Sequence, residues 1–134
     1  MAKKKETDEE RKARLAKIRE ERKAEHAKDL ARFVRVLRAA GNVVRLEVPV
    51  DPTGERRWRI DVALIMVRSE NIAIEIAGRG RHQSIVGFRN DLEKDAESFA
   101  HGWTVVRFSR EMIASGDALE YLSRRGVRVT KRSA

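Results

Sequence analysis

Two short segments, residues 62–67 and 72–77, restrict the possible folds of this chain more than any other feature. The first is apolar on both faces, and the second alternates isoleucine with smaller or charged residues, so both have the pattern of strands. Only a short polar turn around Ser69-Glu70-Asn71 separates them. A connection this short predicts that the two strands pair side by side and antiparallel.

Further helix and strand patterns lie on both sides of this pair. Leu30, Phe33, Val34 and Leu37 share one helical face, and Gly41 is a plausible end for that helix. The other expected elements are strands at 43–50, 57–67 and 103–108, helices at 85–101 and up to Gly126, and a turn at residues 51–54. This order predicts an α/β (α+β) domain with a four-stranded mixed sheet flanked by helices, plus a charged N-terminal helix.

Three local patterns refine the helices. The helix at 85–101 carries an apolar stripe, which predicts the face that is buried: Ile85, Phe88, Leu92, Ala96 and Phe99. Ser109 is placed to cap the helical turn that follows the last strand. Asp117 and Glu120 have the spacing of a capping box for the final helix.

The chain divides into three parts by composition. Residues 1–29 are dense in charges of both signs and read as an exposed helix or a disordered tail. A basic arm that touches DNA, or a helix that joins subunits in a homodimer or to a partner, is the alternative. Residues 30–126 form the expected domain, and 127–134 form a basic C-terminal tail.

The charge balance indicates a polyanionic partner. Lys and Arg number 30 against 21 Asp and Glu, a net charge of +9, and nucleic acid is the commonest partner of such a chain. A basic protein without such a partner is the alternative. The absence of cysteine excludes a disulfide framework and a thiolate metal site. Without a long apolar run or a secretory signal, we expect a cytoplasmic protein with no membrane contact.

Two isolated carboxylates accompany the central strands. Asp61 precedes the first apolar run, and Glu75 is the only charged residue of the second. An acid among apolar residues is costly unless it is paired or binds a cation. Two such acids on neighbouring strands favour a shared divalent cation, for which oxygen ligands suit Mg²⁺ or Mn²⁺. The alternative is two ordinary ion pairs, with Asp61 bound to Arg59 and Glu75 to a basic neighbour.

A longer series of motifs runs through residues 43–124. It consists of Arg59-Ile60-Asp61, then Ile74-Glu75-Ile76-Ala77-Gly78, Arg81-His82, Gly87-Phe88-Arg89-Asn90-Asp91-Leu92-Glu93-Lys94 and Gly102-Trp103-Thr104-Val105-Val106-Arg107-Phe108. This series resembles the PD-(D/E)XK nuclease superfamily, and within it the small VRR-NUC-like and Holliday-junction-resolvase-like nucleases. The resemblance implies a restriction-endonuclease-like core and a metal-dependent DNA endonuclease, with branched or nicked DNA as its candidate substrates.

The resemblance also implies roles for single residues. Asp61, Glu75 and the backbone carbonyl of Ile76 would hold Mg²⁺ (or Mn²⁺). Ala77 departs from the pattern, because the family has lysine or an acid there. In some members a lysine of the next helix substitutes, which makes Lys94 the candidate, although a helical wheel places it opposite the apolar stripe, on the expected solvent side. The departure keeps open a weak or inactive nuclease fold that binds DNA, or an assembly protein.

Basic residues near the carboxylates are the candidate contacts to DNA phosphates: Arg57, Arg59, Arg79, Arg81 and His82. His82 is also a candidate general acid, or an ordinary surface histidine. Trp58 and Trp103 are candidates for stacking on bases, but their places in the strand pattern favour packing in the core.

Overall fold

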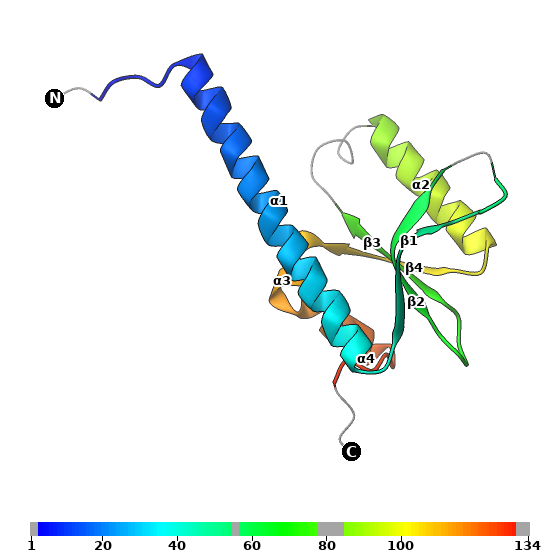
Figure 1. Ribbon diagram of the computed structural model, residues 1–134. Helices are drawn as coiled ribbons and strands as arrows, with labels where there is room; N and C mark the ends of the chain where they lie inside the picture. Colours follow the sequence, from blue (N-terminus) through cyan, green and yellow to red (C-terminus); the bar gives the residue numbers. More distant parts are fainter. Residues whose placement is uncertain (1–2, 55–56, 78–84, 131–134) are drawn as a thin grey trace.

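The computed structural model describes residues 3–54, 57–77 and 85–130 and contains a mixed sheet with helices on its two sides (Figure 1). The elements in chain order are α1 (Asp8–Ala39), β1 (Val43–Pro49), β2 (Arg59–Ile65), β3 (Ile72–Ala77), α2 (Ile85–Ala100), β4 (Thr104–Ser109), α3 (Arg110–Ser115) and α4 (Asp117–Arg124). The predicted class, a four-stranded mixed sheet with flanking helices and an N-terminal helix, is confirmed.

The strands lie in the order β1-β2-β3-β4. β1 pairs with β2 and β2 with β3 in antiparallel fashion, whereas β3 and β4 are parallel. The predicted antiparallel pairing of the two central strands is therefore confirmed, with Val62 opposite Ile74 and Leu64 opposite Ile72. A parallel pair needs a crossover connection, and α2 lies in the segment that makes it.

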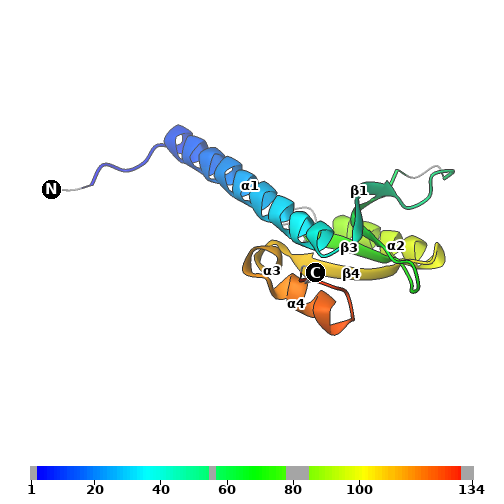
Figure 2. The same cartoon turned by 60° about the horizontal axis from the view of Figure 1, so that its bottom comes forward.

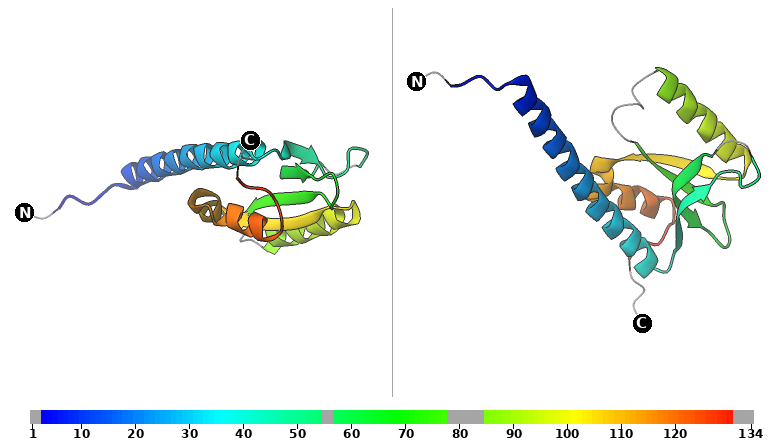
Figure 3. Two further views of the ribbon diagram at one scale, coloured as in Figure 1. Left: turned by 90° about the horizontal axis from the view of Figure 1, so that it is seen from below. Right: turned by 45° about the horizontal axis from the view of Figure 1, so that its top comes forward.

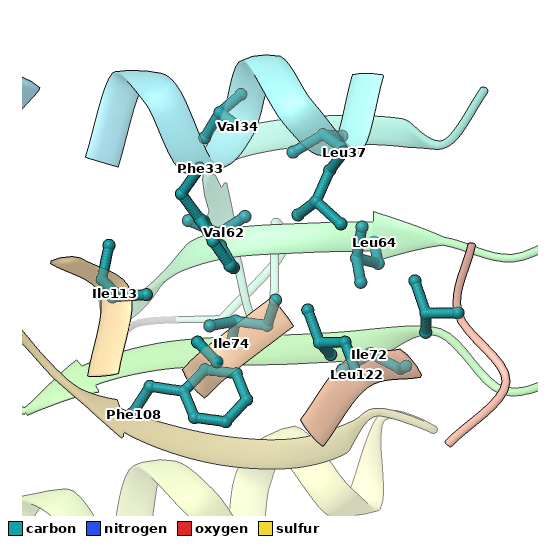
Figure 4. Close-up of a cluster of buried hydrophobic side chains, with 13 residues drawn as sticks. Phe33, Val34, Leu37, Val62, Leu64, Ile72, Ile74, Phe108, Ile113 and Leu122 are labelled. Carbon is teal, nitrogen blue, oxygen red and sulfur yellow. The ribbon is translucent and has the colours of Figure 1, made fainter. Parts of the chain in front are cut away.

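The larger hydrophobic core lies between the sheet and the helices α1, α3 and α4 (Figure 4). Phe33 and Leu37 of α1 point at Val62 and Leu64 of β2, and Leu37 is completely buried. The predicted stripe of this helix is thus the face that packs, and Gly41 follows its end with a left-handed φ of 98°. That conformation costs glycine little and terminates the helix.

A smaller apolar cluster includes Ala63 and Ala73, and Trp58 and Trp103 pack against it as partly buried residues. Both tryptophans therefore pack in the core, as their sequence positions favoured. Among the helices that the structure describes, none is long and apolar enough to cross a membrane.

The N-terminal segment is helical from Asp8 onward. α1 is one helix of 32 residues that begins with a capping box between Thr7 and Glu10, and it passes without a break through the expected boundary at residue 30. Its N-terminal half extends away from the sheet (Figures 1 and 2). At the other end of the domain Val127 is buried, so the core continues into the segment expected to be a tail.

The two predicted caps have different outcomes. Ser109 caps α3 as predicted, since its side chain accepts a hydrogen bond from the backbone of Met112. The capping box of Asp117 and Glu120 is wrong, because Gly116 is the N-cap of α4 and makes no side-chain bond. Gly116 turns tightly from α3 into α4 with a φ of 92°, so Asp117 is already inside the helix.

The prediction for the buried face of α2 is also wrong. Its stripe residues Ile85, Phe88, Leu92 and Phe99 are exposed, whereas Ser98 is buried. α2 packs with its polar face on the sheet, where charged residues of β3 and β4 need partners. A buried charge without a partner costs several kcal/mol, which is comparable with the gain from burying one apolar side chain.

Candidate functional site

The centre of the site is an ion pair between the sheet and α2. The Lys94 ammonium lies 2.7 Å from Oε2 of Glu75, and both side chains are largely buried. The expectation that Lys94 faces solvent is therefore wrong. The helical wheel correctly placed Lys94 opposite the apolar stripe. The error lay in assuming that the stripe faces the sheet, because the opposite, polar face of α2 does so.

Asp61 approaches β3 with its side chain. The last paired residues of the β2–β3 ladder at this end are Val62 and Ile74. Asp61 precedes Val62 in β2, and its Oδ2 accepts a hydrogen bond of 2.8 Å from the backbone N–H of Ile76 in β3. The carboxylate thus replaces the backbone at the end of the ladder. This bond places three predicted site residues, Asp61, Glu75 and Ile76, at one end of two adjacent strands. The alternative pairing of Asp61 with Arg59 does not occur, because the Arg59 guanidinium donates to the backbone of Glu47 at 3.0 Å.

β1 is distorted beside Asp61. Glu47 falls between the paired residues Leu46 and Val48 and has a φ of 52°, the left-handed region that a residue with a side chain rarely adopts. The bond from Arg59 to the Glu47 carbonyl helps to hold this conformation. Strained backbone of this kind persists only where its surroundings enforce it, and it gathers at functional sites.

The environment of Glu75 disfavours its charge. The pKa of Glu75 is raised to about 7, chiefly by burial and also by the negative charge of Asp61, while the hydrogen bond from Lys94 and the charge of Arg107 oppose the shift. Its second oxygen, Oε1, is buried and has no hydrogen-bond donor in reach among the described residues. An unbonded carboxylate oxygen in the interior is costly, so this atom is the candidate ligand for a cation or a water molecule.

A second, partly buried ion pair adjoins the first. Arg107 of β4 is opposite Glu75 in the sheet, and its guanidinium lies 2.7 Å from Asp95 and 4.0 Å from Asp91, both on α2. Sequence reasoning did not assign a role to these three residues. The signal was present, because Arg107 is a lone charge in an apolar strand, as Glu75 is, and Asp91 and Asp95 share one helical face with Lys94.

A groove of about 480 Å³ separates α1 from α3. It contains His26, whose pKa is lowered because burial and the charge of Arg110 outweigh the opposing charges of Asp29 and Asp61. His26 was also missed, since it lies in a charged helix with nothing to distinguish it. The groove is lined by more acidic than basic side chains, so it does not suit a phosphate backbone.

The carboxylates suit a metal with few protein ligands. Within residues 3–54, 57–77 and 85–130, no three His, Cys, Asp or Glu side chains lie close enough to hold one ion. Mg²⁺ is often held by only one or two carboxylates, with water and substrate phosphate completing its shell. Asp61 and Glu75, with Oε1 of Glu75 unbonded, meet that smaller requirement.

The predicted phosphate contacts are described only in part. Arg57 and Arg59 are exposed at the start of β2. Arg79, Arg81 and His82 lie outside the described residues. Comparisons with family models, with characterised proteins and with solved structures gave no match to this chain.

Proposed function

We propose that this protein is a metal-dependent endonuclease that hydrolyses phosphodiester bonds in DNA. The observation that carries the proposal is the arrangement at one end of β2 and β3, where Glu75 is bonded to Lys94 and Asp61 is bonded to the backbone of Ile76. Two carboxylates that can hold a metal ion, beside a positive charge that can offset the charge of a phosphate, suit the metal-assisted hydrolysis of a phosphate ester. The net charge of +9 supports a polyanionic substrate.

In this proposal Asp61, Glu75 and the backbone carbonyl of Ile76 hold Mg²⁺ or Mn²⁺, which when bound polarises a phosphate oxygen and lowers the pKa of a water. Asp61 also fixes β3, because one of its oxygens accepts the Ile76 N–H and the other is left for the ion. Lys94 supplies the positive charge that Ala77 cannot. Its ammonium is held by Glu75, from where it can orient the attacking water and offset negative charge.

A specific observation favours a second candidate, a DNA-binding module without catalysis. The ammonium of Lys94 already lies 2.7 Å from Glu75, so a fixed positive charge neutralises that carboxylate without any metal. Only two carboxylates and no third side-chain ligand meet among the described residues. Such a module would bind DNA through its phosphates and leave the strand intact.

The first experiment is a cleavage assay with Mg²⁺ or Mn²⁺ on branched, flapped, nicked and linear DNA. We expect cleavage of at least one of these forms by the wild type, and loss of at least 100-fold in rate for Asp61→Asn and for Lys94→Met. Asp117→Asn is the matched control, because Asp117 is exposed on α4 and its side chain caps nothing. Equal loss in the control would show that the assay reports stability alone.

A binding assay separates the two candidates. DNA affinity should fall steeply with salt, because each phosphate contact releases counterions. Mn²⁺ should raise the melting temperature of the wild type but less so in Asp61→Asn and Glu75→Gln, since a ligand of the native state stabilises it. DNA binding that weakens with salt, without cleavage and without a rise in melting temperature on adding Mn²⁺, would establish the second candidate. A DNA affinity that does not change with salt concentration would contradict both.

A further inference from the structure

The outer face of α2 is an apolar surface that the other described elements of the chain do not cover. Its side chains are exposed to 74% at Ile85, 58% at Phe88, 52% at Leu92 and 78% at Phe99. No described helix or strand lies on the outer side of this helix (Figure 3). A monomeric soluble protein rarely exposes a contiguous apolar patch larger than a few hundred Å², so this face indicates an interaction site.

We infer that α2 is a dimerisation helix, which packs antiparallel on α2 of a second copy of this chain with Leu92 at the twofold axis. This inference is independent of the proposed nuclease function. In a twofold pair centred on Leu92, Ile85 meets Phe99 of the second copy, and Phe88 meets its Ala96. Phe88 thus faces a small residue, and Leu92 meets the same residue of the second copy, as in a self-complementary twofold interface.

Charge supports the same arrangement. Apart from Arg89 and Lys94, the charged residues of α2 are acidic, so this helix does not suit a DNA backbone although the whole chain carries +9. Arg89 and Glu93 lie on one flank of the stripe, and the antiparallel pair brings Arg89 of one copy beside Glu93 of the other. A parallel pair would instead leave Ala96 opposite Ala96.

The available area is adequate for a dimer of ordinary size. The exposed parts of the four large stripe residues amount to on the order of 600 Å² of apolar surface, given roughly 150–250 Å² for a whole aromatic side chain. A stable interface needs about 800 Å² from each partner, and the polar flanks of α2 supply the rest. The inner face of α2 is held on the sheet by Lys94 and Asp95, so the outer face is presented on a fixed helix.

The first test is the mass of the full chain in solution, measured by sedimentation or light scattering. We expect twice the 15.4 kDa of one chain for the wild type. Leu92→Asp should weaken association by at least 100-fold, because it sets two carboxylates against each other at the axis. Val67→Asp is the control, since Val67 is 93% exposed at the turn after β2. A monomeric wild type at its highest soluble concentration, or a dimer that Leu92→Asp leaves intact, overturns the inference and assigns the face to another occupant.

The second test establishes the register. Ala96→Phe should weaken the dimer, and the double variant with Phe88→Ala should restore it, because the large and small partners are exchanged. The chain has no cysteine, so Leu92→Cys introduces a single thiol. Under mild oxidation it should form a disulfide with the same cysteine of the second copy. Val67→Cys should remain unlinked. No rescue in the double variant, or equal linking through residue 67, contradicts the antiparallel pair about Leu92.

Discussion

The two long helices, α1 and α2, carry similar apolar stripes but use them in opposite ways. α1 buries Phe33, Val34 and Leu37 against the sheet. α2 exposes its stripe and turns Lys94, Asp95 and Ser98 inward. The difference shows that an apolar stripe predicts only that a helix face will be covered. Whether the same chain or another one covers it depends on what the opposing surface requires.

The largest expected effect comes from comparing two phenylalanines, Phe33 in the stripe of α1 and Phe99 in the stripe of α2. Phe33→Ala should lower the free energy of unfolding by about 3–5 kcal/mol, because it leaves a cavity in the main core. Phe99→Ala should lower it by less than about 0.5 kcal/mol in the dissociated chain, since Phe99 is exposed. Urea denaturation at low protein concentration measures both. Similar losses for the two variants would show that the outer face of α2 is covered within the monomer.

The inner face of α2 gives the next effect. Lys94→Met removes the partner of Glu75 and should cost about 2 kcal/mol at pH 8, less than a fixed buried pair would, because Glu75 can take up a proton. At pH 5 Glu75 is neutral in the folded protein, so the loss should shrink. Denaturation at the two pH values tests this, with Arg89→Met as the control on the exposed side of the same helix. A loss that does not depend on pH contradicts the assigned ion pair.

Glu75 predicts a dependence of stability on pH in the absence of metal. Its pKa is about 7 in the folded protein and 4.5 without the fold, so the folded state binds more protons between these values. Stability should therefore fall as pH rises from 4.5 to 7 and then level off. Glu75→Gln should flatten this part of the profile, because glutamine does not titrate. A stability that rises from pH 4.5 to 7 in the wild type but not in Glu75→Gln would falsify the assigned upward shift in the pKa of Glu75.

The smallest effect concerns the two halves of α1. Thr7→Ala removes the capping box, which contributes about 1 kcal/mol to the local helix. Because the N-terminal half of α1 extends away from the core, global unfolding should change by less than about 0.5 kcal/mol. Hydrogen exchange should detect the loss as faster exchange in the first turns only. A large drop in the global free energy of unfolding would mean that this half packs on something in solution.

Much of the fold was predictable because its signals are local. The pairing of β2 with β3 follows from a short turn between two apolar strands, and the packing of α1 follows from its stripe and from Gly41. Part of the site was equally accessible. Lone acids at 61 and 75 on adjacent strands had to lie near each other, and the bond from Asp61 to Ile76 places them at the same end. The position of Lys94 was not accessible, because it depends on which face of α2 turns inward.

The sequence by itself determined which segments become strands and helices, that β2 pairs with β3, and which charged residues stand in apolar surroundings. The tertiary structure decided the orientation of α2. Glu75 and Arg107 come together only when β3 and β4 pair, and together they present a charged surface that Lys94 and Asp95 neutralise. That surface is built from residues far apart in the chain, so the periodicity of one helix carries no information about it. An apolar stripe can stay exposed until a second molecule covers it, whereas a buried charge must be paired within the fold.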